Sequence, residues 1–78
     1  MTPAELKAAR HSFGLSAEGF ARLVRVDSGR TVRRWEAGER DIPGPVTVIV
    51  ELLQRSPEAR SLLLPASEDG AQLLPARL

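Results

Sequence analysis

The residues best suited to chemistry in this chain are six arginines gathered between positions 22 and 40. Three of them lie in the stretch Gly29–Gly38, where the apolar residues Val32 and Trp35 are three positions apart. If this stretch is a helix, Val32 and Trp35 share a buried face and the guanidinium groups point outward. Guanidinium groups suit phosphates and the acceptor edge of guanine, so the pattern predicts a helix that recognises DNA. The six arginines are Arg22, Arg25, Arg30, Arg33, Arg34 and Arg40.

The charge of the chain is concentrated around these arginines. The formal net charge is only +1, but residues 22–40 hold six arginines against three acids and so carry +3, which leaves −2 for the rest. A charge distribution this uneven favours a polyanionic partner at one face. Almost all basic residues of the chain are arginine, which could equally reflect a GC-rich genome, but base composition does not explain the clustering.

Length and composition exclude several classes of protein. A chain of 78 residues holds one small domain without room for a large catalytic cleft, so we expect its function at the surface. The absence of cysteine excludes disulfides and thiolate metal sites. The single histidine, His11, lacks a glycine elbow or a third orienting group, no nucleotide-binding loop is present, and the acids lack metal-ligand spacing. We therefore expect neither an enzyme nor a cofactor nor a metal, and, without a signal peptide or membrane span, a soluble cytoplasmic protein associated with the nucleoid.

Capping residues and glycines divide the chain into five short helices and so predict an all-α fold. Typical starts are the capping box Thr2-Pro3-Ala4-Glu5 and Ser16, and typical stops are Gly14 and Gly38. The third helix can be capped by Asp27 or Ser28. The predicted helices span about residues 3–13, 17–25, 29–38 and 45–54, followed by a shorter one that begins at Pro57 and carries Leu62 and Leu63.

Residues 46–50 carry conflicting signals. Every residue from Val46 to Val50 is β-branched and would suit a strand. Val46, Ile49, Val50 and Leu53 nevertheless have the spacing of one helix face, so we favour a helix. After Pro65 the content of Ser, Glu, Asp, Gly and Pro indicates a poorly packed tail. We therefore expect a domain over residues 1–64 and a tail over 65–78 that is flexible or associated with a dimer.

From about Leu6 to Leu53 the sequence resembles the Cro and phage-repressor type of helix-turn-helix DNA-binding domain, also called XRE-like. The densest parts of the match are residues 14–24, Gly-Leu-Ser-Ala-Glu-Gly-Phe-Ala-Arg-Leu-Val, and residues 31–40, Thr-Val-Arg-Arg-Trp-Glu-Ala-Gly-Glu-Arg. Two departures leave the turn conformation and the register of the third helix open. The usual turn glycine is Arg25 here, and the span from Val26 to Thr31 is one residue longer than usual.

Several positions have structural roles in this interpretation. Ala21 is small enough to lie where two steeply crossed helices approach most closely, and Trp35 is better explained as a core residue than as a base-stacking one. In proteins similar to this one the acid after the tryptophan pairs with an arginine of the first helix. The resemblance therefore implies a buried pair between Arg10 and Glu36; the alternative is that the pair is exposed or absent.

The resemblance also implies which residues contact DNA. It places Gly29, Arg30 and Arg34 at exposed positions that reach base edges, with Arg33 beside them. Glycine can read nothing by its side chain, so specificity should depend mainly on Arg30 and Arg34. Arg33 is a candidate for phosphate as well. The other candidates for phosphate contact are Arg22, Arg40 and the start of the second helix at Ser16 and Ala17.

The function implied is that of a sequence-specific transcription regulator that binds double-stranded DNA, a repressor of phage, prophage or plasmid type that occludes a promoter. The alternatives are the antitoxin of a toxin–antitoxin pair, which would also bind a protein, and a protein-interaction module that keeps the fold without binding DNA. We expect a homodimer on a palindromic operator, formed through Val48 and Leu52 together with Leu62–Leu64 and Leu73–Leu74. The competing explanation is that these residues pack a second core layer of the same domain.

Overall fold

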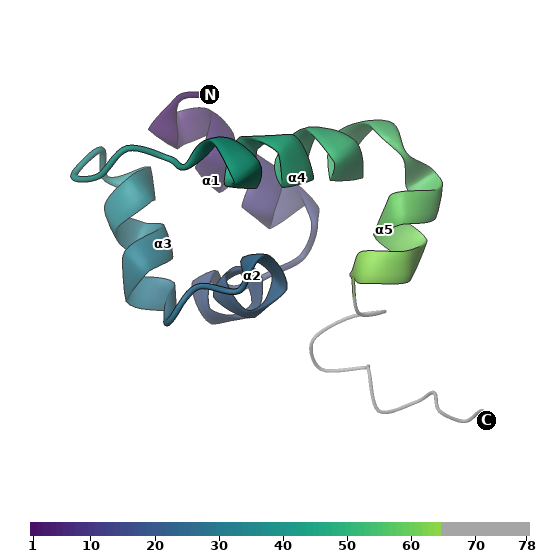
Figure 1. Cartoon of the computed structure of the whole chain (residues 1–78), viewed down its shortest axis with the longest axis horizontal. Helices are drawn as coiled ribbons and strands as arrows, with labels where there is room; N and C mark the ends of the chain where they lie inside the picture. The colour runs from purple at the N-terminus through teal and green to yellow at the C-terminus, as the bar shows by residue number, and fades with distance from the viewer. Residues whose placement is uncertain (65–78) are drawn as a thin grey trace.

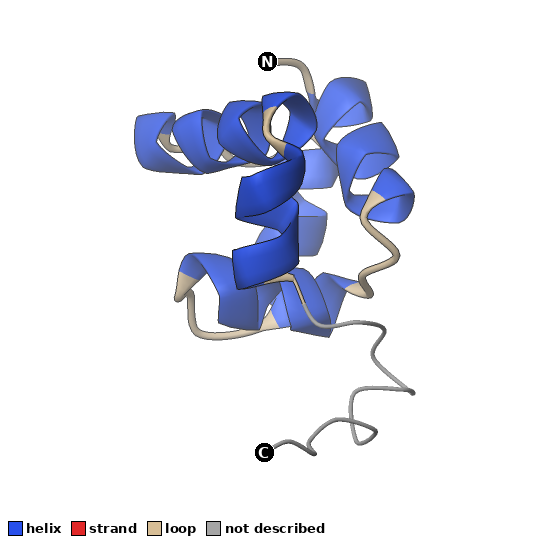
Figure 2. Ribbon diagram, turned by 90° about the vertical axis from the view of Figure 1, so that its right-hand side faces the viewer, coloured by secondary structure: helices blue, strands red, loops and turns tan. Residues whose placement is uncertain are grey.

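The computed structural model describes residues 1–64 and shows an all-α domain of five helices. The helices are α1 (Pro3–Ser12), α2 (Ala17–Val24), α3 (Gly29–Glu36), α4 (Gly44–Arg55) and α5 (Pro57–Leu63). Figure 1 shows α4 crossing the molecule beside α1, with α2 and α3 on the other side, and Figure 2 shows helix and loop only in the described part. Helices α2 and α3 form a helix-turn-helix, as predicted. The predicted tail over 65–78, with Leu73 and Leu74, lies outside the described residues.

The starts of the helices follow the capping signals of the sequence. At α1 the capping box is complete: Thr2 N–H donates to Glu5 Oε1 at 2.8 Å and Glu5 N–H donates to Thr2 Oγ1 at 3.1 Å. At α2 the Ser16 hydroxyl accepts from Gly19 N–H at 3.0 Å. Helix α1 is followed by Gly14 with a φ of +74°, a conformation that glycine adopts without a steric penalty. The predicted bounds of α1 and α2 are therefore confirmed to within one residue.

The turn between α2 and α3 keeps a left-handed residue although no glycine stands there. Arg25 has φ 66° and ψ 39°, and it ends α2 by donating its N–H to the carbonyl of Ala21. Val26 N–H donates to the same carbonyl at 3.0 Å, which closes the turn. The left-handed conformation costs a non-glycine residue about 1 kcal/mol or more. The turn conformation left open by the sequence is thus the left-handed one, with an arginine bearing the strain.

The core lies between α1, α2, α3 and the inner face of α4. Phe20, Leu6, Leu53, Val32 and Val50 are its largest fully buried side chains. Ala21 of α2 is buried in this core. Trp35 is buried on the same face of α3 as Val32, as predicted.

Residues 46–50 are helical, which resolves the conflict between helix and strand. Val46, Val50 and Leu53 face the core, while Ile49, expected on the same stripe, is only half buried. Helix α4 begins at Gly44, one residue before the expected start at Pro45. Burial of one face against the core outweighs the strand preference of β-branched residues.

Helix α5 leaves the end of α4 at a steep angle (Figure 1), and a hydrogen bond from Arg60 joins the two helices. Arg60 Nη1 donates to the carbonyl of Leu53 at 2.6 Å, and Ser56 caps α5 by accepting from Ala59 N–H at 3.0 Å. Ala59 is buried, whereas Leu62 is exposed. None of the helices in residues 1–64 is both long and apolar enough to cross a lipid bilayer.

Candidate nucleic-acid interface

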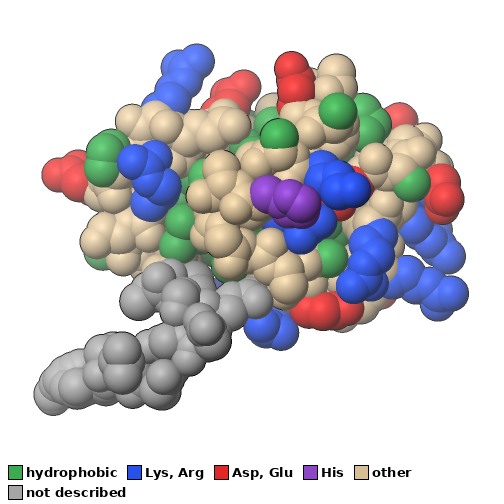
Figure 3. Space-filling model, turned by 180° about the vertical axis from the view of Figure 1, so that it is seen from behind, with side chains coloured by type: hydrophobic (Ala, Val, Ile, Leu, Met, Phe, Trp, Pro, Cys, Tyr) green, Lys and Arg blue, Asp and Glu red, His purple; other side chains and the backbone are tan. Residues whose placement is uncertain are grey.

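Helix α3 has one apolar face and one cationic face. Val32 and Trp35 are buried, whereas Arg30 and Arg33 are exposed and Arg34 is half buried. These three arginines line a shallow hollow of about 360 Å³ together with Ala37 and Glu39. Figure 3 shows the molecule from behind, and several of its Lys and Arg side chains gather at the right, which is the left-hand end in Figure 1, where α3 lies. The geometry presents guanidinium donors on one side of a helix whose other side is fixed in the core.

The N-terminus of α3 is capped from another helix rather than by the residues expected to do so. Ser28 occupies the N-cap position, but its side chain makes no capping hydrogen bond. Gly29 N–H instead donates to Glu18 Oε1 of α2 at 2.9 Å. Asp27 accepts from Thr31 Oγ1 at 2.8 Å. The expectation of a cap by Asp27 or Ser28 was therefore wrong, because Glu18 accepts from the first amide of the helix instead.

Gly29 was expected to be exposed, and this expectation was wrong. Gly29 is buried because α2 lies directly against it. A methyl group added at Gly29 would lie 2.6 Å from Glu18 Oε2 and 2.9 Å from Glu18 N, both closer than real contacts allow. Its glycine identity is therefore explained by the close approach of two helices, and only Arg30, Arg33 and Arg34 remain as accessible candidates for base contact.

Two carboxylates, those of Glu18 and Asp27, each contact a side chain of α3. Arg33 Nη1 lies 3.7 Å from Glu18 Oε2, and both side chains remain more than half exposed, at 63% and 52%. The pKa of Asp27 is lowered, first because the Thr31 hydroxyl donates to its carboxylate and to a lesser degree because nearby backbone amides do so. This end of the helix is therefore polar, loosely paired and open to solvent.

The C-terminal end of α3 is held by a buried ion pair. Arg10 Nε donates to Glu36 Oε2 at 2.7 Å and Arg10 Nη2 donates to Glu36 Oε1 at 3.0 Å, while Nη1 donates to the carbonyl of Leu15 at 3.0 Å. The two side chains are 11% and 7% exposed. The structure thus brings together the two residues whose pairing the family resemblance implied, and the Arg10 side chain points inward. Two parallel hydrogen bonds between guanidinium and carboxylate fix both distance and orientation.

The candidate phosphate contacts lie on α2 and after α3. Arg22 and Arg40 are exposed, as is Ser16, whose hydroxyl is used in the cap of α2. Ala17 is buried, so only its backbone amide is suited to contact an anion. Arg40 comes two residues after Gly38, whose φ of +78° turns the backbone after α3. The first turn of α2 lies beside the start of α3, because Glu18 accepts from Gly29 N–H.

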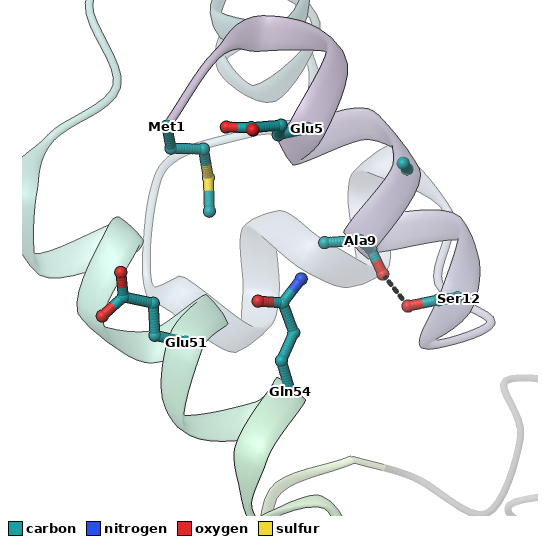
Figure 4. Close-up of a pocket in the computed structure, with 7 residues that line it drawn as sticks. Met1, Glu5, Ala9, Ser12, Glu51 and Gln54 are labelled. Carbon is teal, nitrogen blue, oxygen red and sulfur yellow. Dashed lines mark hydrogen bonds between the residues drawn. The ribbon is translucent and has the colours of Figure 1, made fainter.

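A second hollow lies between α1 and α4 and differs in character. It measures about 500 Å³, and Figure 4 shows Glu5 and Glu51 on its two sides with Met1 at one end and Gln54 on α4. No arginine lines it. Within residues 1–64 no group of three or more His, Asp or Glu side chains could hold a metal ion. This hollow is therefore acidic and unlike the surface beside α3.

The outer side of α4 and α5 carries exposed apolar side chains. Val48 and Leu52 are 63% and 48% exposed, and Leu62 and Leu63 are also exposed. Leu64 is half buried against the core. Within the described residues, Val48 and Leu52 therefore do not pack a second core layer, and only Leu64 of the C-terminal leucines behaves in that way.

Glu18 is the residue of this region that sequence reasoning missed. It stands in the first turn of α2, where an acid interacts favourably with the dipole of its own helix, and this local role does not point to a partner on α3. Its partner Gly29 is eleven residues away, so no local spacing reveals the contact. The available signal was the glycine itself, which stands at the start of a helix where a close backbone approach is one reason for glycine.

No protein-family model matches the chain. The chain is 39% identical over 62 residues to Antitoxin HigA-2 of Vibrio cholerae. This alignment covers 78% of the chain and 58% of the antitoxin, so the chain spans little more than half the length of that relative. The protein is therefore an all-α helix-turn-helix protein that is similar in sequence to an antitoxin.

Proposed function

We propose that this chain binds double-stranded DNA in a sequence-specific manner through α3. The observation that carries the proposal is the division of α3 into a face buried through Val32 and Trp35 and a face that presents arginines. An α-helix fits the major groove, and arginine can donate two parallel hydrogen bonds to guanine O6 and N7. The proposal is of a binding protein and not of an enzyme.

Within this interface we assign base contacts first to Arg30 and Arg34. Both line the hollow beside α3, and neither has a carboxylate partner among the ion pairs described above. Arg33 lies beside them but is paired with Glu18. We assign contacts to phosphate to Arg22, Arg40 and the start of α2 at Ser16 and Ala17, because both arginines are exposed and the start of α2 lies beside the start of α3.

The biological role that we propose is the antitoxin of a toxin–antitoxin pair. Similarity to Antitoxin HigA-2 supports this role more than it supports a phage-type repressor. An antitoxin of this kind would bind DNA and a protein toxin, and repression by promoter occlusion would be one part of its action. We assign DNA binding to α3 and toxin binding to a surface outside α3.

We further propose that the chain acts as a homodimer on a palindromic operator. One recognition helix contacts few base pairs, and two such helices can occupy successive major-groove faces about 34 Å apart. The exposed Val48 and Leu52 on α4 supply an apolar surface for a second copy. Light scattering should give twice the mass of one chain, and Val48→Glu and Leu52→Glu should shift it toward the monomer. A wild-type monomer that protects a single half-site would contradict the dimer.

Binding-site selection tests the DNA-binding proposal. Randomised duplexes selected on the wild type should converge on one sequence, and Arg30→Ala and Arg34→Ala should each lose about 1–3 kcal/mol of specific binding and relax the preference at one base pair. Arg40→Ala should weaken all sequences alike, and Arg55→Ala on α4 should change nothing. An unchanged preference in both α3 variants would reject the assignment.

Co-expression tests the proposed antitoxin role. If an adjacent reading frame encodes a toxin, its expression alone should arrest growth and expression of both genes should restore it. Arg30→Ala should still restore growth, because α3 is proposed to bind DNA and not the toxin. No rescue by the wild type, together with intact operator binding, would favour a simple repressor; a chain that binds no DNA but rescues growth would favour an interaction module.

A further inference from the structure

The start of α3 depends on a side chain of α2. Ser28 supplies no capping hydrogen bond, and Gly29 N–H donates to Glu18 Oε1 at 2.9 Å. A local cap is thus replaced by a contact across the helix-turn-helix, which ties the position of α3 directly to α2.

The two helices are so closely packed at this contact that there is no room for a side chain at Gly29. An added methyl at Gly29 would lie 2.7 Å from Glu18 Cδ and 2.9 Å from Glu18 N. The second of these atoms belongs to the backbone and cannot rotate away. The glycine therefore allows the start of α3 to lie this close to the start of α2. The hydrogen bond from Gly29 N–H to Glu18 depends on this close approach.

The same carboxylate also faces an arginine of the cationic surface. Glu18 Oε2 lies 3.7 Å from Arg33 Nη1, at a place where both side chains are exposed. The N-terminus of a helix attracts anions, and here a carboxylate of the protein already stands beside it. A DNA phosphate approaching α3 at this point would meet a like charge, and Arg33 would have to leave its partner to bind it.

We propose that Glu18 is a specificity-determining residue of the DNA interface. It positions α3 by capping Gly29, and it keeps Arg33 from binding phosphate on arbitrary sequences. This inference rests on the proposed function. Specific binding should gain from the fixed position of Arg30 and Arg34, whereas non-specific binding should be weakened by the carboxylate. Glu18 therefore increases the ratio between the two.

Two substitutions separate these roles. Glu18→Gln keeps an acceptor for Gly29 N–H and removes the charge that restrains Arg33, whereas Glu18→Ala removes both. The probes are the duplex recovered by binding-site selection and a scrambled duplex of the same length. On the scrambled duplex, Glu18→Gln should gain one phosphate contact, so a fourfold rise in salt should weaken its binding about threefold more than that of the wild type.

Adding Arg33→Gln to Glu18→Gln should return this salt dependence to that of the wild type, because no guanidinium is then released. Glu58→Gln on α5 is the control for net charge and should show no increase. Glu18→Ala should in addition shift the Gly29 amide resonance and speed its hydrogen exchange, while Glu18→Gln should preserve both. The ratio of selected to scrambled affinity should fall in both variants, and further in Glu18→Ala.

The outcomes distinguish this inference from the proposed function. A wild type that selects no sequence would reject the proposed function and the role of Glu18 with it. A wild type that binds selectively, with Glu18→Gln matching Glu58→Gln in salt dependence and in selectivity, would overturn the role of Glu18 alone. A Gly29 amide that does not respond to Glu18→Ala would overturn the capping part.

Discussion

Helix α3 takes part in two arginine–glutamate pairs with neighbouring helices, and the two pairs are built differently. At the C-terminal end, Arg10 and Glu36 are buried and share two short hydrogen bonds. At the N-terminal end, Glu18 accepts from Gly29 N–H, and the ion pair that Glu18 forms with Arg33 is exposed and longer. A buried pair is costly to break from either side, whereas an exposed pair contributes little to stability. The same residue types thus anchor α3 at one end and leave it open to exchange with another molecule at the other.

The largest expected effect comes from breaking the buried pair. Arg10→Met or Glu36→Gln should each lower the free energy of unfolding by about 3–5 kcal/mol, because each strands the partner in a nearly dry environment. The double variant should lose less than the sum of the single losses. Denaturant unfolding of all four proteins measures this coupling, and small additive losses would show that the pair does not anchor α3.

Gly29→Ala should come next, because it forces α2 and α3 apart. The methyl group would overlap Glu18, and overpacking of this kind typically costs about 1–3 kcal/mol. Combining it with Glu18→Ala should recover only part of the loss, since the backbone nitrogen of Glu18 remains in the way. Gly44→Ala is the matched control, because no atom lies within 4 Å of the added methyl there. Equal thermal stability of Gly29→Ala and wild type would argue against the close approach.

Breaking the exposed pair should affect stability less. Arg33→Gln should change the free energy of unfolding by less than about 1 kcal/mol, and the difference should shrink in high salt. Denaturant unfolding at low and high salt tests this expectation. A loss as large as that of Arg10→Met would remove the contrast between the two ends.

The smallest effect concerns Asp27, just before α3. Its pKa is lowered below the ordinary value of 3.8, chiefly by the hydrogen bond from Thr31. The stability contributed by the ionised carboxylate is therefore present above pH 3.8 and is lost as the pH falls through the lower folded pKa. Thr31→Val should raise the pKa of Asp27 toward 3.8 in an NMR titration. An equal pKa of Asp27 in the wild type and in Thr31→Val would show that the hydrogen bond from Thr31 does not lower it.

Most of the fold could be predicted because its signals are local. The capping box at Thr2 and the cap at Ser16 fixed the starts of α1 and α2, and the spacing of Val32 and Trp35 fixed the buried face of α3. The choice of helix for residues 46–50 needed the competing apolar stripe, of which Ile49 turned out to be only half buried.

The N-terminal end of α3 could not be predicted in the same way. Asp27 and Ser28 both have side chains typical of caps, and nothing in their spacing shows that Glu18 takes this place. The expected exposure of Gly29 failed for the same reason, since it depends on the distance between two helices. At Arg25 the closure of the turn outweighs the preference of a non-glycine residue for negative φ, so the residue type alone does not predict the left-handed conformation. The pairing of Arg10 with Glu36 came from the resemblance to a family and not from spacing.

The most direct test of DNA binding through α3 is an NMR titration of the labelled protein with the duplex recovered by selection. The largest shifts should appear at the side-chain Nε–H groups of Arg30 and Arg34 and at the backbone amides that begin α2 and α3. Glu5 and Glu51, beside the hollow between α1 and α4, should shift little. Large shifts around that hollow or along α5, with α3 unchanged, would contradict DNA binding through α3.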